Sequence, residues 1–169
     1  IPSWTHGAWL DLPDVHGVGA ASGAYTSVDR VWQVGDRIDL HLPMVPRLVV
    51  SHPRVAMNAG QVALTRGPIV YCLEAVDHPG VDVSSIELDA HSPWEAHAAE
   101  GLPADIVALR GHGQVRADQV AGPGAPLYQA LHGDAPHGGP TVVTAVPYFA
   151  WANRTPGAMT TWVPVATVP

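Results

Sequence analysis

Glycine and proline interrupt this chain at short intervals, and that punctuation limits what it can fold into. The 169 residues contain 17 glycines and 17 prolines, about one residue in five against a usual share of about 12%. Both residue types end regular elements and start turns. Because 47% of the residues are apolar, the chain still has enough to bury to form a core. We therefore expect a globular chain built from short elements.

Apolar and polar residues alternate over several short segments, which is the pattern of half-buried strands. The alternation is clearest in residues 37–44, where Ile38, Leu40 and Leu42 share one face. Residues 25–32 are rich in strand-forming types, and the turn-forming residues 33–36 connect the two segments, so we expect a hairpin. Further strands are expected at residues 61–65, 69–73, 85–88, 106–109, 127–131, 141–147 and 159–163.

Helix signals are scarce. The best begins at Ser92, which forms a capping box with Glu95, has Pro93 at the first helical position and meets a stop at Gly101. It predicts one short helix near residues 93–100. Many short strands with almost no helix indicate an all-β fold.

Two prolines interrupt the apolar residues near position 50 and suggest a domain boundary there. We expect two antiparallel, jelly-roll-like β-sandwich domains. The first, over residues 1–50, is expected to be incomplete. The second covers residues 51–169, and its last strand is expected either to stay in this domain or to return to the first.

The charge balance excludes some classes of partner. All eight basic residues are arginines, and 15 acidic residues leave a net charge of −7, so no basic surface for nucleic acid is expected. No apolar run approaches the roughly 18 residues of a membrane span, so no membrane partner is expected either. The chain starts at Ile1 without a methionine, which predicts a fragment of a longer protein. Its location is left open, with the cytoplasm as the default.

Candidate catalytic and metal-binding residues are few. The single cysteine, Cys72, permits no intrachain disulfide and no cysteine zinc cluster, and we expect it to be a small buried side chain. The ten histidines include no H-x-H or H-E-x-x-H arrangement. Those beside glycine or proline are expected in solvated loops: His6, His78, His112, His132 and His137.

Glu74 and Asp77 lie where a strand leads into a loop, and glycoside hydrolysis commonly uses two carboxylates. A solvated or arginine-paired strand end is the favoured interpretation of this pair. Tryptophans suit either a sugar-stacking platform or a core, and the core is favoured. The six are Trp4, Trp9, Trp32, Trp94, Trp151 and Trp162.

Three separated motifs resemble the C-terminal part of glycoside hydrolase family 127, the β-L-arabinofuranosidase family. The first is IPSW at 1–4 with RVWQVGD at 30–36 and LPM at 42–44. The second is VALTRGPIVYCLE at 62–74, and the third is PYFAWANR at 147–154 with Met159 and Trp162. The motifs run through nearly the whole chain except residues 81–141.

This resemblance implies a longer protein with an N-terminal (α/α)₆ barrel followed by two β-sandwiches, of which this chain holds the sandwiches. In the family, a cysteine nucleophile, a glutamate acid/base and a zinc ion bound by three cysteines and a glutamate lie on the barrel. With Cys72 alone, and that in a strand motif, no catalytic residue, cofactor-binding residue or metal ligand transfers to this chain. Zinc is expected in the barrel, and the complete protein is expected to be a retaining arabinofuranosidase.

The resemblance thus indicates a non-catalytic region that supports the barrel, its partner within the same polypeptide. Alternatives are a stand-alone carbohydrate-binding module and a purely structural one. Arg66 to Pro68 fits a turn between two strands, and Arg154 is expected to pair with Glu74. Candidate structural or sugar- or domain-contacting residues are Arg66, Glu74, Tyr148, Trp151, Asn153 and Arg154.

Overall fold

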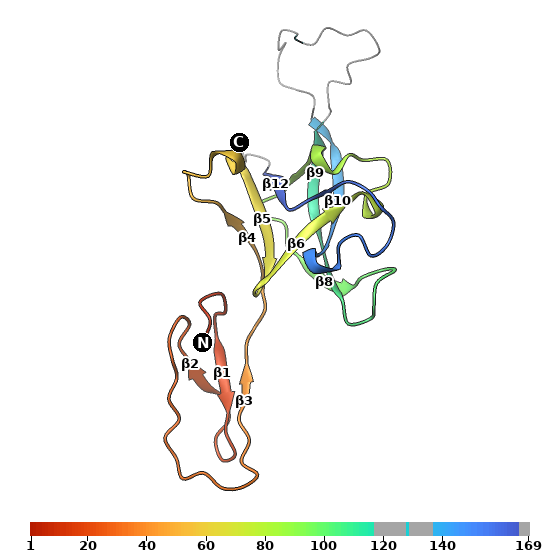
Figure 1. The fold of residues 1–169 in the computed structure, drawn as a ribbon. Coiled ribbons are helices and arrows are strands. Elements are labelled where there is room, and N and C mark those ends of the chain that lie inside the picture. The colour runs from red at the N-terminus through yellow and green to blue at the C-terminus, as the bar shows by residue number, and fades with distance from the viewer. Residues whose placement is uncertain (117–127, 129–136, 166–169) are drawn as a thin grey trace. The chain divides into compact units, whose positions relative to one another are not determined.

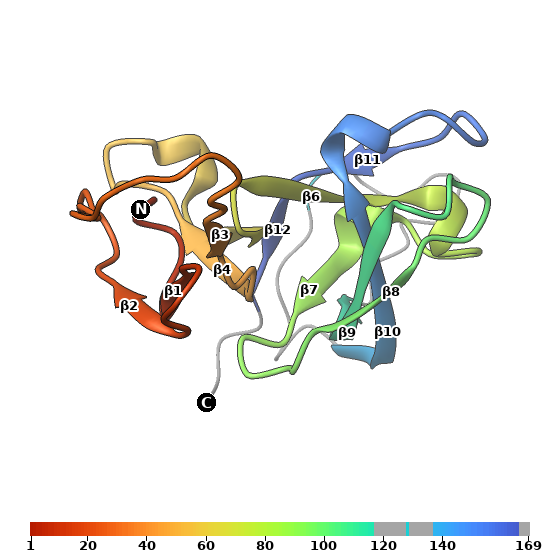
Figure 2. The ribbon, with the colours of Figure 1, turned by 90° about the horizontal axis from the view of Figure 1, so that it is seen from below.

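The computed structural model describes residues 1–116, 128 and 137–165, and these residues form an all-β fold (Figures 1 and 2). The all-β prediction is confirmed. The strands are β1 (Ala8–Asp11), β2 (Val18–Ala20), β3 (Asp39–His41), β4 (Pro46–Val50), β5 (Gln61–Arg66), β6 (Ile69–Glu74), β7 (Ile86–Leu88), β8 (Glu95–Ala98), β9 (Val107–Arg116), β10 (His137–Pro147), β11 (Met159–Thr160) and β12 (Trp162–Pro164). Four short 3₁₀ turns join them: η1 (Ala56–Asn58), η2 (Ala75–Asp77), η3 (Val83–Ser85) and η4 (Tyr148–Ala150). No helix found among these residues has the length and apolar character that a membrane crossing would require.

The chain divides into two compact units. Unit 1 comprises Ile1–Pro46 with Arg66–Pro68, and unit 2 comprises Arg47–Thr65 with Ile69–Pro169. The division falls close to the boundary expected near residue 50. The turn between β5 and β6 is grouped with unit 1, although both strands belong to the sheet of unit 2.

Unit 1 contains a three-stranded antiparallel sheet in the order β2-β1-β3. Trp9 on β1 faces His41 on β3, and their rings stack with centroids 4.7 Å apart. His41 Nε2 also lies 2.9 Å from Asp11 Oδ2, and the Gly17 N–H donates to Oδ1 of the same carboxylate at 2.9 Å. The Gly17 hydrogen bond, and after it the interaction with His41, hold the pKa of Asp11 below its ordinary value despite some desolvation.

Gly67, in the turn Arg66–Pro68, shows why this expected turn needs glycine. Its φ is +59°, a left-handed conformation that side chains rarely adopt. A Cβ at this position would also lie 2.8 Å from Met44 Cε and 3.3 Å from Trp4 Cζ3. Both the backbone conformation and the available space therefore favour glycine.

The expected hairpin of residues 25–32 with residues 37–44 is wrong. No strand forms over residues 25–32, and β3 pairs with β1 instead. Of the hairpin, only the connecting turn is present, closed by a 3.1 Å hydrogen bond from the Asp36 N–H to the Gln33 carbonyl. Tyr25, Val31 and Trp32 of residues 25–32 are exposed, so this segment buries little apolar surface that would stabilise strand pairing.

Unit 2 contains a nine-stranded sheet whose main path is β12-β5-β6-β10-β9-β7, with β4 on β5, β8 on β9 and β11 on β6. The sheet curls, so that β6 crosses the direction of β9 and β10 (Figure 2). The last described strand, β12, pairs with β5 inside this unit. The main core cluster of unit 2 consists of buried side chains from this sheet and the adjoining turn η3: Val62, Leu64, Tyr71, Leu73, Val83, Ile86, Leu88, Leu109, Val143, Ala145 and Val163.

Six of the expected strands in unit 2 are confirmed. Residues 61–65, 69–73, 85–88, 106–109 and 141–147 overlap β5, β6, β7, β9 and β10, and residues 159–163 divide into β11 and β12. Of the strand expected at 127–131, every residue except 128 lies outside the described part of the chain.

The short helix expected near residues 93–100 is wrong, because residues 95–98 form β8 and pair with β9. Ser92 does not cap a helix. Its hydroxyl instead accepts a 2.8 Å hydrogen bond from the His112 N–H of β9 and donates one to the Pro93 carbonyl. Trp94 lies against Gly111, where a Cβ would come within 2.8 Å of the indole ring. These contacts with β9 override the local capping signal.

Candidate functional site

An ion cluster joins three segments of unit 2 around Arg154. One of its terminal nitrogens, Nη2, lies 2.5 Å from Glu74 Oε2 at the end of β6 and 2.6 Å from Asp77 Oδ2 in η2. The other, Nη1, lies 2.7 Å from Asp77 Oδ1 and 3.3 Å from the Glu100 carbonyl oxygen. Only 9% of the Arg154 side chain and 4% of the Glu74 side chain are exposed. The pairing of Arg154 with Glu74 expected from the sequence is therefore present.

The electrostatics of the cluster follow from this geometry. The hydrogen bonds with Asp77 raise the pKa of Arg154 most, those with Glu74 raise it further, and desolvation opposes both. A planar guanidinium can satisfy two carboxylates in this way, whereas an ammonium group offers a single point charge. The sequence-based interpretation of Glu74 and Asp77 favoured a solvated or arginine-paired strand end, and the structure shows the arginine-paired arrangement.

The Glu74 carboxylate also holds the loop of residues 148–154, which contains the aromatic residues of the third sequence motif. Glu74 Oε1 accepts a 3.1 Å hydrogen bond from the Ala152 N–H, and Ala152 has φ +60°. Within the described residues it is the one non-glycine residue with positive φ. The Asn153 amide donates to the Ala150 carbonyl at 3.1 Å and closes the loop from inside. The loop between η4 and Arg154 is thus bonded at both ends.

The loop presents three partly exposed aromatic side chains, which we call the aromatic group: Tyr148, Phe149 and Trp151. The rings of Tyr148 and Trp151 lie nearly parallel, with centroids 6.0 Å apart and planes 14° apart. Phe149 is 65% exposed. The structure therefore brings five of the six candidate residues together, namely Glu74, Tyr148, Trp151, Asn153 and Arg154. Arg66 belongs to the turn of unit 1 and makes no ion pair within the described residues.

A polar hollow of about 230 Å³ adjoins the ion cluster. His97 of β8, Arg110 of β9 and Thr144 of β10 reach it from neighbouring strands, and Asp77 and Arg154 form another part of its wall. His97, Arg110 and Thr144 are not among the sequence-based candidates. Their strands pair in the register Thr144–Arg110 and His97–Ala108, a relationship between distant segments that no local pattern contains.

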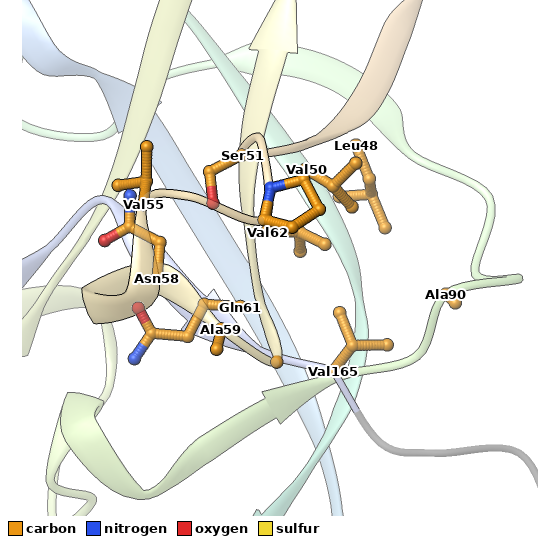
Figure 3. Close-up of a pocket in the computed structure, with 12 residues that line it drawn as sticks. Leu48, Val50, Ser51, Val55, Asn58, Ala59, Gln61, Val62, Ala90 and Val165 are labelled. Atoms are coloured by element: carbon orange, nitrogen blue, oxygen red, sulfur yellow. The ribbon is translucent and has the colours of Figure 1, made fainter.

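A second hollow, of about 680 Å³, lies between β4, η1, β5 and the end of β12 (Figure 3). We call it the apolar hollow. Aliphatic side chains, among them Leu48, Val50, Val62 and Val165, line most of it. Its lining contains no acidic, basic or histidine side chain, so it has no ionisable group for acid–base chemistry and none to activate the Ser51 hydroxyl.

Cys72 and His78 are structural residues. Cys72 is 2% exposed, and desolvation, helped by Glu74 and Asp77, raises the pKa of its thiol to about 12. The expectation that it is a small buried side chain is confirmed. The expectation that His78 lies in a solvated loop is wrong, because it is buried and bridges two strands. Its Nε2 accepts from the Thr144 N–H at 3.2 Å, so its Nδ1 donates to the Glu74 carbonyl at 2.8 Å.

Contrary to expectation, the other histidines that stand beside glycine or proline do not all lie in solvated loops. His6 is exposed, as expected, whereas His112 lies in β9 and not in a loop. His137 opens β10, and His132 lies outside the described residues. Among the residues that the structure describes, no group of three or more histidine, cysteine, aspartate or glutamate side chains could hold a metal ion. A zinc site with three cysteine ligands does not fit this chain, because Cys72 is its one cysteine.

By its fold the protein is an all-β protein. Its buried ion cluster holds its own loops in place. The family is shown by comparison. The model of the glycoside hydrolase family 127 C-terminal domain matches residues 46–164, and the chain therefore belongs to this family.

Individual relatives agree with that family. The chain is 36% identical over 171 residues to a non-reducing end beta-L-arabinofuranosidase of Bifidobacterium longum subsp. longum, covering 94% of this chain and 24% of that protein. It resembles the crystal structure of a family 127 beta-L-arabinofuranosidase from Geobacillus stearothermophilus T6 with a TM-score of 0.79 and 33% identity, covering 98% of this chain and 26% of that one. A further solved glycoside hydrolase matches with a TM-score of 0.80 and 31% identity, covering 98% and 27%. The chain spans about a quarter of the length of these relatives.

Proposed function

We propose that this chain is the non-catalytic C-terminal region of a longer polypeptide that hydrolyses terminal β-L-arabinofuranosides. The observation that carries the proposal is the match to the family's C-terminal domain in a chain about a quarter as long as its relatives. In this proposal a catalytic barrel and its zinc ion belong to the remainder of the polypeptide. The role of the present region is to pack against that remainder and support it.

The carboxylates and the cysteine of this chain are bonded or buried in a way that supports a non-catalytic role. A retaining glycosidase needs one group to protonate the leaving oxygen and another to attack the sugar. Here the two neighbouring carboxylates, Glu74 and Asp77, both accept hydrogen bonds from Arg154 and face inward. The raised pKa of Cys72 keeps its thiol protonated at neutral pH, and its burial excludes a substrate.

The apolar hollow is the surface we assign to the contact with the remainder of the polypeptide. Its lining is mostly aliphatic and open to solvent, so a partner that covers it buries apolar side chains. Val50 and Val55 on its rim are largely exposed. About three quarters of the length of the relatives lies outside the matched region, which supplies an occupant within the same polypeptide.

The test compares the 169-residue chain with a version extended at its N-terminus to the length of the relatives. Both are assayed with a chromogenic β-L-arabinofuranoside, and circular dichroism confirms that each is folded. We expect release of the chromophore only from the extended protein. Hydrolysis by the 169-residue chain alone would contradict the proposal, as would an inactive, folded extended protein.

A second experiment tests the assigned contact. Val55→Asp in the extended protein is expected to lower its melting temperature more than it lowers that of the 169-residue chain, because only the extended protein has a partner over the hollow. Val142→Asp, at an exposed position of β10 that lines none of the hollows described here, is the control. Equal shifts for Val55→Asp in the two proteins would exclude the apolar hollow as the contact.

A further inference from the structure

We propose that the polar hollow beside the ion cluster binds a neutral, hydroxyl-rich ligand of monosaccharide size, held by His97, Arg110 and Thr144. This goes beyond the supporting role and is independent of it, because binding here needs neither the barrel nor hydrolysis. The hollow measures about 230 Å³, below the roughly 300–1,000 Å³ of pockets for drug-sized molecules. Its size therefore suits one sugar ring.

Several hydrogen-bonding groups of the hollow have no partner within the described residues. Arg110 and Thr144 line the hollow, and within the described residues neither side chain makes a hydrogen bond to another residue. The Arg154 side chain is nine-tenths buried, and its Nε is unpartnered although both terminal nitrogens are bonded. Arg154 Nε is enclosed by the protein, whereas Arg110 is exposed and Thr144 is half-buried, so water solvates these two groups and a ligand in the hollow can replace that water.

His97 contributes its imidazole ring to the wall of the hollow. Its Nδ1 lies 2.8 Å from the Ala98 carbonyl oxygen, which can only accept, so the proton is on Nδ1. Nε2 of the neutral ring is then left with a lone pair, and it is enclosed by the protein without a partner in the described structure. A ligand hydroxyl both donates and accepts, so it can accept from Arg110 and donate to the Thr144 oxygen while the His97 ring forms part of the wall.

The charges around the hollow select a neutral ligand over an anion. Arg110 and Arg154 contribute two positive charges to the lining, and Asp77 and Glu100 contribute two negative ones. Glu74, which also binds Arg154, adds a further negative charge nearby. A carboxylate or phosphate would find no net attraction here, whereas sugar hydroxyls need none.

An adjoining hollow extends the site for a longer ligand. It has a volume of about 380 Å³ and is lined by Leu102, Ile106 and Phe149 among others. Consecutive residues line the two hollows at two places in the chain. Glu100 and Arg154 line the polar hollow, and their neighbours Gly101 and Asn153 line the second one. The exposed ring of Phe149 offers an apolar face of the kind that packs on a sugar ring.

The test is an NMR titration of the 169-residue chain with L-arabinose, an arabinofuranosyl disaccharide and glucuronate. We expect saturable shifts of the His97, Arg110 and Thr144 amides with the two neutral sugars, tighter binding of the disaccharide, and no such shifts with glucuronate. Arg110→Gln and Thr144→Val should each weaken binding roughly 2- to 10-fold, the value of one hydrogen bond. Phe149→Ala should remove the advantage of the disaccharide.

Matched controls lie on the same strands. Arg116→Gln on β9 and Thr141→Val on β10 do not line either hollow and should leave binding unchanged. Thermal unfolding shows which variants are folded, and Arg110→Gln and Thr144→Val test the site independently of each other. Absence of saturable binding of both neutral sugars, preferential binding of glucuronate, or equal effects of site and control variants would each overturn the proposal.

Discussion

Arg154 donates a hydrogen bond to Glu74 from 80 positions further along the chain, with Nη2 and Oε2 2.5 Å apart and both side chains almost fully buried. This contact ties the loop carrying the aromatic group to the end of β6. Removing one member of a buried ion pair is more harmful than losing a surface pair, because the remaining charge stays buried without a partner.

Arg154→Ala is therefore expected to lower the free energy of unfolding by about 3–5 kcal/mol. Arg154→Lys should recover part of the loss, since an ammonium group cannot pair with both carboxylates as the guanidinium does. Urea denaturation measures both. Arg37→Ala, which breaks a mostly exposed pair with Asp39, is the control and should cost less than about 1 kcal/mol. A loss for Arg154→Ala as small as this control would show that the cluster does not stabilise the fold.

Ala152 has a left-handed backbone conformation that costs a non-glycine residue about 1–2 kcal/mol. Ala152→Gly should relieve this strain while keeping the N–H that donates to Glu74, so we expect stability to stay equal or to rise by up to about 1 kcal/mol, the gain being reduced by the flexibility of glycine in the unfolded chain. Ala96→Gly in the exposed part of β8 should instead destabilise. Equal losses for the two variants in chemical denaturation would contradict the assigned strain.

Gly111 leaves room for the indole of Trp94, and that contact helps to hold β8 on β9. Gly111→Ala places a Cβ about 2.8 Å from ring atoms and should cost about 1–3 kcal/mol of stability. It should also change the tryptophan fluorescence. Gly139→Ala, on β10 with open space around the added Cβ, serves as the comparison. If both substitutions shift the melting temperature alike, Trp94 does not set the packing of β8.

Cys72 gives the fold a dependence on alkaline pH. Its thiol has an ordinary pKa of 9.0 in the unfolded chain and about 12 in the folded one, so the folded state holds the proton more tightly. Its contribution to stability is therefore complete below about pH 9 and is lost as the pH rises toward 12. Urea midpoints measured between pH 7 and pH 11 should fall more steeply for the wild type than for Cys72→Ala. Parallel curves would show that the thiol does not titrate abnormally.

Features set by a local run of residues could be predicted from the sequence, whereas contacts between distant strands could not. The strand over residues 69–73 was predictable from its continuous apolar run, and its residues 71–73 are buried on both faces of the sheet. The pairing of Arg154 with Glu74 was foreseeable from a turn and a strand end that both carry charge. Asp77 was also foreseeable, because it follows Glu74 by three residues. The convergence of His97, Arg110 and Thr144 on one hollow depends on the strand order β6-β10-β9-β8, which is not encoded in any local segment.

By itself, the sequence determined that this chain is all-β, because frequent glycine and proline allow only short elements and the apolar residues between them alternate or cluster at strand length. It also determined the family, through motifs at both ends of the chain. Only the tertiary structure decided which local signals prevail. Residues 93–100 carry a capping box yet form β8, since hydrogen bonds and packing offered by β9 outweigh a cap. Residues 25–32 favour a strand yet form none, since most of their apolar side chains, Tyr25, Val31 and Trp32, stay exposed and gain little from pairing.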